Sequence, residues 1–154
     1  MTVSASTPVF FSRFTRRFDS KRRIGIPSEW FEGPNEGISH FLGWLETERG
    51  CLRVYPDTFV EHLLRDTETS RESDLEAKRK QAQLFSRAQY LKLDPQHRIS
   101  VEAALADHLG FKASVVLLAE NQSFSIWAEE RFLESPYAQN ISLSDLFSEV
   151  ENLR

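Results

Sequence analysis

Cysteine is nearly absent from this chain, and so are long hydrophobic runs and the motifs of common enzymes. A single cysteine, Cys51, excludes an internal disulfide and any cysteine-rich zinc site, and it favours a reducing cytoplasm. The longest apolar run, residues 115–119, is far too short to cross a bilayer. No phosphate-binding loop, His-Glu-x-x-His or nucleophile elbow occurs. The sequence therefore predicts no catalytic residue, no metal, no cofactor and no membrane contact.

The composition that remains is globular, but its charge is unevenly distributed. The 154 residues, 40% of them hydrophobic and 27% charged, suffice for one domain or two very small ones. The formal net charge of −4 is an average of two unlike parts. Residues 1–27 hold six basic side chains and one acid, a charge of +5, whereas residues 28–154 hold 13 basic and 22 acidic side chains, a charge of −9. Such asymmetry indicates an electrostatic role for the N-terminal segment.

The six cations all lie within residues 13–23, interleaved with Phe14 and Phe18. Three interpretations compete for this segment. The segment can be a solvated charged face, which is what most charge runs are. It can be a transit peptide, because it is rich in Ser and Arg and poor in acids. It can also be a folded cationic surface that binds phosphates. Composition alone leaves all three open.

An internal repeat excludes the transit peptide. Residues 18–26, Phe-Asp-Ser-Lys-Arg-Arg-Ile-Gly-Ile, match residues 93–101, Leu-Asp-Pro-Gln-His-Arg-Ile-Ser-Val, so that Asp19 corresponds to Asp94 and Arg23 to Arg98. The shared pattern is apolar, Asp, three variable residues, Arg, Ile, small, β-branched. A cleavable presequence has no reason to reappear as the opening of an internal repeat.

Each copy of this pattern is followed by a short helical turn and by two strands around a turn. These elements are expected at 27–31, 40–47 and 51–55 in the first unit, and at 100–110, 114–119 and 123–127 in the second. Residues 13–27 and 90–101 should each form a hairpin, and the two hairpins should pack across a pseudo-two-fold axis. Their apolar residues Ile24, Ile26, Ile99 and Val101 should point inward.

Three further helices are predicted outside the two units. They are a helix over 58–64 capped by Asp57, a partly buried helix over 73–88, and an amphipathic helix over 142–153 capped by Ser144. The predicted organisation is a first repeat at 12–59, a helical linker at 60–87, a second repeat at 88–131 and a tail at 132–154.

Four motifs in order resemble those of the MraZ family, the two-repeat branch of the AbrB/SpoVT-like transcription factors. They are residues 18–27, the Val-Tyr-Pro of 54–56, residues 93–101, and the Phe-Ser-Ile-Trp of 124–127. The resemblance implies an α+β, β-dominated fold in which two swapped-hairpin repeats form a double-split β-barrel. It also implies a cytoplasmic, nucleoid-associated transcriptional regulator, typically a repressor of its own division and cell-wall operon. Such proteins assemble into homo-oligomeric rings and bind repeated promoter boxes in double-stranded DNA.

This sequence departs from the family pattern at one repeated place. The glycine that precedes the motif's arginine is Arg22 in the first copy and His97 in the second. A glycine there supplies a positive φ, which costs another residue about 1 kcal/mol or more. Either the turn is of another type, or the strain is accepted in return for extra positive charge.

The candidate DNA-binding side chains are cations of the two hairpins. In the first hairpin they are Arg13, Arg17, Lys21, Arg22 and Arg23, and in the second they are Lys92 and Arg98. Asp19 and Asp94 are expected to stabilise the turns by accepting hydrogen bonds from backbone N–H groups or by pairing with the arginine four residues later.

The alternative to a DNA-binding regulator is an antitoxin-like or scaffold module that has the same fold and binds a protein partner. Exposed Trp30, Phe31 and Trp44 are expected to favour an oligomer larger than a dimer.

Overall fold

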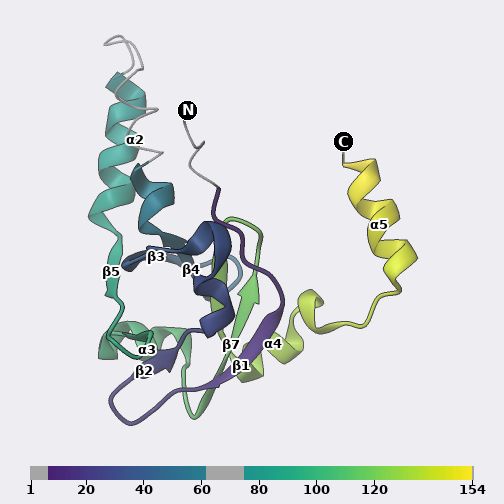
Figure 1. Cartoon of the computed structure of the whole chain (residues 1–154), viewed down its shortest axis with the longest axis horizontal. Coiled ribbons are helices and arrows are strands. Elements are labelled where there is room, and N and C mark those ends of the chain that lie inside the picture. Colours follow the sequence, from purple (N-terminus) through teal and green to yellow (C-terminus); the bar gives the residue numbers. More distant parts are fainter. Residues whose placement is uncertain (1–6, 62–74, 154) are drawn as a thin grey trace.

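The computed structural model describes residues 7–61 and 75–153. The strands of this part are β1 (Arg13–Arg17), β2 (Arg23–Gly25), β3 (His40–Glu46), β4 (Cys51–Pro56), β5 (Gln89–Lys92), β6 (Arg98–Ser100), β7 (Ser114–Ala119) and β8 (Phe124–Ala128). The helices are α2 (Leu75–Ser86), α3 (Ala103–Leu109), α4 (Glu129–Glu134) and α5 (Leu143–Asn152), with 3₁₀ turns η1 (Ser28–Phe31), η2 (Gly33–Asn35) and η3 (Pro136–Ala138). Figure 1 shows the short strands in the middle of the molecule, with α2 on one side and α5 on the other.

The two halves of the chain exchange strands. The larger sheet has six antiparallel strands in the order β1-β7-β8-β4-β3-β5, and β2 and β6 form a separate pair. Thus β1 of the first half pairs with β7 of the second, and β5 of the second half pairs with β3 of the first. The α+β, β-dominated class is confirmed, and the crosswise pairing agrees with swapped hairpins. Closure into a double-split barrel stays a prediction.

The two expected hairpins are looser than predicted. β1 and β2 are joined by a tight turn, yet they pair with each other only through the bridge between Phe18 and Ile24. Beyond this bridge the strands diverge, because β1 adds to the edge of the six-stranded sheet while β2 pairs with β6. β1 and β2 therefore each form most of their strand hydrogen bonds with a strand from the second half of the chain.

The core is built where the alternation of the short strands predicts it. Ile24 and Ile99 face each other across β2 and β6, and both are fully buried, as Ile26 and Val101 nearly are. Burial of one such side chain contributes about 1.5–3 kcal/mol. Trp30, which we expected at the surface, is instead fully buried and donates from Nε1 to the carbonyl of Phe11 at 2.8 Å. It packs among aromatic rings of both halves, so the prediction for this residue is wrong.

The helices lie close to the predicted positions. α3 ends as predicted at Gly110, whose φ of 74° gives the left-handed cap. Residues 57–61 are helical, and the remainder of the expected 58–64 helix lies outside the described residues, as do 73 and 74. α2 is partly buried, as predicted: none of its side chains is fully buried, but Ala77, Gln81 and Phe85 are half-buried, and the Phe85 ring packs against Trp44 with centroids 6.2 Å apart. None of the described helices is long and apolar enough to span a membrane.

The cap of α5 differs from the prediction by two residues. Ser142, not Ser144, is the N-cap, and its hydroxyl accepts a hydrogen bond from the backbone N–H of Asp145 at 3.3 Å. Ser144 lies inside the first turn. A serine at either position can start this helix by sequence, and only the backbone geometry distinguishes them.

Candidate functional site

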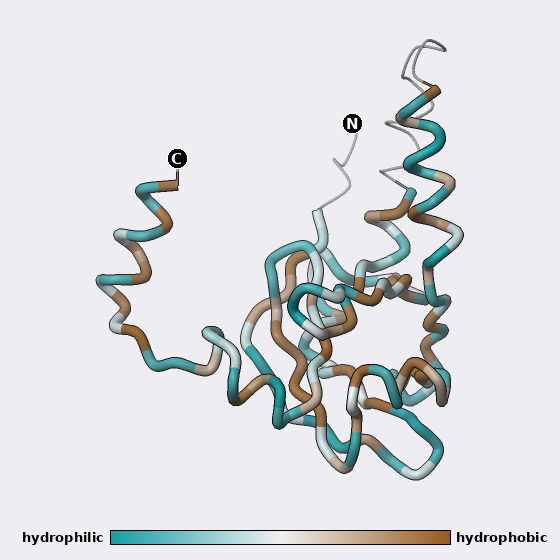
Figure 2. The backbone as a smooth tube through the Cα atoms, turned by 180° about the vertical axis from the view of Figure 1, so that it is seen from behind, coloured by the Kyte–Doolittle hydropathy of each residue, from teal (hydrophilic) through white to brown (hydrophobic). Residues whose placement is uncertain are grey.

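The turn between β1 and β2 is held by one aspartate. Asp19 accepts hydrogen bonds at Oδ1 from the backbone N–H groups of Lys21, at 2.9 Å, and Arg23, at 2.8 Å. Its Oδ2 accepts from Nε of Arg23 at 2.8 Å. These contacts fix the backbone of the variable residues, so that the turn is rigid while its side chains remain free to face outward. The turn protrudes at the lower edge of the molecule and is largely hydrophilic (Figures 1 and 2).

The second turn has the same geometry. Asp94 accepts at Oδ1 from the backbone N–H groups of Gln96, at 2.8 Å, and Arg98, at 2.9 Å, and at Oδ2 from Nε of Arg98, at 2.8 Å. Because β2 and β6 are antiparallel, with Arg23 opposite Ser100 and Gly25 opposite Arg98, the two turns lie at opposite ends of this short sheet. The arrangement is pseudo-symmetric.

Both aspartates are held in the charged form. The backbone hydrogen bond from Arg23, with the side-chain and charge contacts of that residue, places the pKa of Asp19 below its ordinary value. Partial desolvation raises the pKa of Asp94, but hydrogen bonds from the backbone and side chain of Arg98 outweigh it, and the pKa of Asp94 is also lowered. Each carboxylate therefore stabilises its turn through its charge.

The residues that replace glycine keep the glycine conformation. Arg22 has a φ of 60° and His97 a φ of 58°, so the turn type is unchanged and the strain is accepted. The side chains make contacts that offset part of this cost. Nε of Arg22 donates to the carbonyl of Val101 at 3.1 Å, and the His97 ring stacks on Phe31 with centroids 4.2 Å apart.

Backbone hydrogen bonds join the two turns crosswise. The N–H of Val101 donates to the carbonyl of Arg22 at 2.9 Å, and the N–H of Ile26 donates to the carbonyl of His97 at 2.8 Å. Each turn is thus anchored on the strand that leaves the other. A change in one turn should be felt at the base of the second.

The cations around the first turn are the more exposed set. Arg17, Lys21 and Arg22 are exposed, and none of them forms an ion pair within the described part of the chain. The corresponding positions of the second turn hold Lys92, Gln96 and His97, only one of which carries a permanent positive charge. Arg23 and Arg98 are about equally exposed, at 29% and 32%, and each is engaged with its aspartate.

Arg13, predicted with the same group, lies elsewhere. It stands at the start of β1, about 13 Å along the strand from Arg17, and its Nη1 donates to the carbonyl of Tyr137 at 3.2 Å. Its guanidinium also lies over the ring of Phe132 at 5.5 Å. Arg13 is exposed on β1, and its contacts with residues more than a hundred positions away left no local signal in the sequence.

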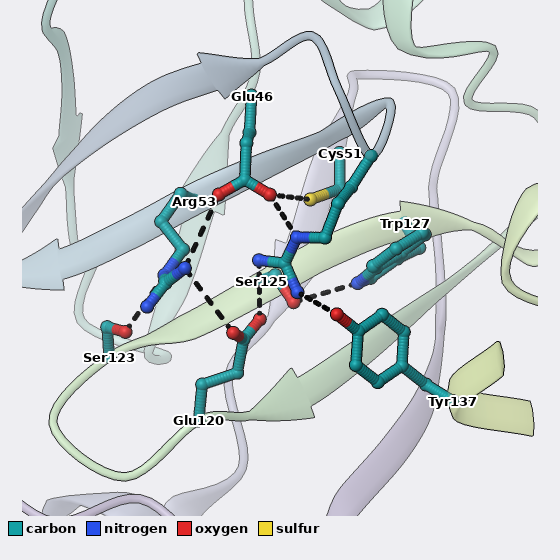
Figure 3. A network of polar contacts seen from close by, with 9 residues as sticks. Glu46, Cys51, Arg53, Glu120, Ser123, Ser125, Trp127 and Tyr137 are labelled. Atoms are coloured by element: carbon teal, nitrogen blue, oxygen red, sulfur yellow. Dashed lines mark hydrogen bonds and ion pairs between the residues drawn. The ribbon is translucent and has the colours of Figure 1, made fainter. Parts of the chain in front are cut away.

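A second polar cluster connects the turn end of the β3–β4 hairpin with the turn end of the β7–β8 hairpin (Figure 3). Arg49 pairs with Glu46, and its Nη2 donates to Oε2 of Glu120 at 3.0 Å. Arg53 lies 3.4 Å from a carboxylate oxygen of each glutamate. Although burial raises the pKa of Glu46, the two arginines lower it below its ordinary value. Each charge here has an opposite charge beside it, so the cluster stabilises the sheet and leaves no charge directed to a ligand.

Cys51 belongs to the same cluster and is fully buried, with its Sγ 3.8 Å from Oε2 of Glu46. Desolvation raises the pKa of its thiol to about 12, so the thiol stays protonated at neutral pH. Among residues 7–61 and 75–153, no group of three or more His, Cys, Asp or Glu side chains could hold a metal ion.

Several known proteins that are similar to this chain share one name. No protein-family model matches the chain. The "Transcriptional regulator MraZ" of Lachnoclostridium phytofermentans is 26% identical over 141 residues, 92% of this chain and 96% of the relative. Those of Symbiobacterium thermophilum (29% over 137 residues; 89% and 94%) and Thioalkalivibrio sulfidiphilus (29% over 117 residues; 76% and 78%) are similar too. Their names are those of regulators rather than enzymes, in agreement with the predicted lack of catalysis. The resemblance to the MraZ family that the four motifs indicate is therefore confirmed over most of the chain.

Proposed function

We propose that this chain is a sequence-specific DNA-binding transcriptional regulator that binds double-stranded DNA mainly through the turn between β1 and β2. The observation that supports this most is the combination of a rigid turn with outward cations. Asp19 accepts two hydrogen bonds from the backbone and one from the Arg23 side chain, and Arg17, Lys21 and Arg22 are exposed around it. A cationic surface that is ordered before binding loses less entropy on contact with phosphates.

The side chains divide by role in this proposal. Arg17, Lys21 and Arg22 neutralise phosphates, which positions the protein without specifying sequence. Arg23 is held by Asp19 with part of its guanidinium exposed, and an oriented guanidinium suits bidentate contact with phosphate or with guanine O6 and N7. Arg98 is held in the same way in a turn that carries less charge, and with Lys92 it makes the weaker contribution.

The finer parts of the proposal come from the family resemblance. In these parts of the proposal, the protein binds repeated boxes in its own promoter, represses its division and cell-wall operon, and assembles into a homo-oligomeric ring. A ring would present several first turns at once, and their combined binding would raise the affinity for repeated boxes. The name carried by the relatives, transcriptional regulator, supports the coarse function.

A mobility-shift assay tests the proposal. The purified chain is titrated against the DNA upstream of its own gene, with a shuffled fragment of the same length as control. Retardation of the upstream fragment at a protein concentration at least tenfold lower than for the control is expected. Equal retardation of both fragments would contradict sequence-specific regulation. Binding to neither would favour the antitoxin-like or scaffold alternative, in which the same fold binds a protein.

A further inference from the structure

The last helix carries an apolar stripe that no described residue covers. Leu143, Leu146, Phe147 and Val150 of α5 follow the spacing i, i+3, i+4, i+7, and their exposed fractions lie between 41% and 67%. This is the spacing of a helix that binds with one face in a groove. Isolated helices of this length are marginal in water, so α5 needs a surface to pack on.

α5 stands clear of the rest of the described chain. Figures 1 and 2 show it at the end of an extended connection, on the side of the molecule opposite to α2. None of its residues is buried. In the arrangement of the described residues, the apolar stripe is therefore open to a further packing surface.

The same chain contains a groove between α2 and β3. Its volume is about 700 Å³, and its apolar floor comprises Trp44, Leu45, Leu84 and Leu105. Nε1 of Trp44 donates to the carbonyl of Leu84 at 2.7 Å, which fixes the floor against the end of α2. Lys80, Gln83 and Arg87 line the groove beside Leu84, and these four residues have the spacing of a single helix face.

The charges of the two surfaces are complementary. α5 carries three acidic side chains, Asp145, Glu149 and Glu151, and no basic one. Of the acids, Glu149 and Glu151 border the apolar stripe on either side at 100° per residue. The groove is bordered by Lys80 and Arg87, for which no ion pair is found among the described residues. An acidic amphipathic helix fits a basic-rimmed apolar groove in both respects.

We propose that α5 of one copy of this chain binds in the α2–β3 groove of a second copy. The helix and the groove are different surfaces, so the contact is heterologous, and its repetition leads to a closed ring or an open filament. Phe147 and Leu146 lie on Trp44 and Leu84, while Glu149 and Glu151 lie near Lys80 and Arg87. The inference rests on the homo-oligomer of the proposed function and is independent of DNA binding.

Cysteine cross-linking between two differently tagged variants tests the contact. One batch carries Phe147→Cys and the other Gln83→Cys, and they are mixed under mild oxidation. A disulfide between the two tags is expected, and it can form only between copies. Ser148→Cys, on the opposite face of α5, is the matched control and should give at least tenfold less cross-linked product. Equal cross-linking from both positions, or none from either, would overturn the proposal. So would a disulfide found only when both cysteines are in one chain, because α5 would then fold back on its own groove.

Sedimentation velocity with exchanged charges supplies the second measurement. Lys80→Glu combined with Arg87→Glu should weaken self-association about tenfold or more, and addition of Glu149→Lys with Glu151→Lys should restore it. An oligomer that is insensitive to all four changes would refute this contact and leave the homo-oligomer standing. A wild-type monomer at micromolar concentration would refute both. Neither result bears on the mobility-shift assay, which tests DNA binding by itself.

Discussion

The two turns that follow β1 and β5 share a backbone and differ in charge. Each has an aspartate that accepts two backbone N–H groups and pairs with the arginine four residues later. Each also has a non-glycine residue at positive φ. Between these fixed points the first turn holds Ser-Lys-Arg, whereas the second holds Pro-Gln-His. The comparison separates what the fold needs, which is conserved between the turns, from what only one turn offers.

This separation makes the second turn a control for the first within the same molecule. Arg17, Lys21 and Arg22 correspond in position to Lys92, Gln96 and His97. A change that acts through the backbone should therefore have similar effects in both turns. A change that acts through phosphate contacts should affect the first turn more.

The largest difference is expected from removal of the three exposed cations. The combined variant Arg17→Ala, Lys21→Ala, Arg22→Gly should weaken binding to the upstream DNA by about 100- to 1,000-fold, because charge-assisted contacts are worth about 1.5–3 kcal/mol each before losses from solvent screening. Lys92→Ala, Gln96→Ala, His97→Gly is the matched variant and should cost tenfold or less. Fluorescence anisotropy of a labelled fragment measures both, and equal losses would show that the turns contribute alike.

The next largest effect is expected at Arg23 and Arg98, the arginines that pair with the turn aspartates. Arg23→Ala should weaken DNA binding by about 1–3 kcal/mol, and Arg98→Ala should weaken it less. Both variants should lose stability, because Asp19 and Asp94 each lose their charged partner. Urea unfolding alongside anisotropy separates the two effects. Intact binding by a folded Arg23→Ala protein would favour the protein-binding alternative.

Acid should destabilise both turns to a similar degree. The folded-state pKa values of Asp19 and Asp94 are lowered, so their contribution is complete above the unfolded value of about pH 4 and is lost as the pH falls through the folded values. Asp19→Asn and Asp94→Asn should each flatten the dependence of unfolding free energy on pH below about pH 4. Urea titrations at several pH values check this. A flattening confined to one variant would mean that the turns are not equivalent.

The smallest effect isolates the backbone strain. Arg22→Gly should be more stable than Arg22→Ala by about 1 kcal/mol, because both lose the same side-chain contacts and only glycine adopts a φ of 60° without cost. His97→Gly and His97→Ala should differ by the same amount. Thermal unfolding compares the four variants. If alanine is as stable as glycine at either position, the turn has relaxed to another conformation.

Local pattern predicted the parts of this fold that depend on neighbouring residues. The positions of β3, β4, β7 and β8 were predicted within about two residues, as was the cap of α3 at Gly110. The inward direction of Ile24 and Ile99 followed from alternation along a strand. The sequence left two alternatives for both turns, another turn type or accepted strain, and the positive φ of Arg22 and His97 distinguishes them in favour of strain.

Features that depend on distant residues were not predictable in this way. The burial of Trp30 results from its packing against Phe10, Phe14 and Phe124, which come from three other segments. Arg13 donates to the backbone carbonyl of Tyr137, a residue more than a hundred positions away. The exchange of strands between the halves came from the family resemblance, because the hydrophobic pattern of a strand does not specify its partner.

The salt dependence of DNA binding tests the central claim most directly. Anisotropy titrations of the wild type, the first-turn triple variant and the matched second-turn variant are repeated at several salt concentrations. Each phosphate contact contributes a slope of about −0.9 to the log–log plot. The account predicts that the first-turn variant has a slope shallower by about 2 to 3, whereas the second-turn variant changes it by about 1 or less. Unchanged slope for the first-turn variant, with the fold intact, would contradict the claim that this turn binds the phosphates of DNA.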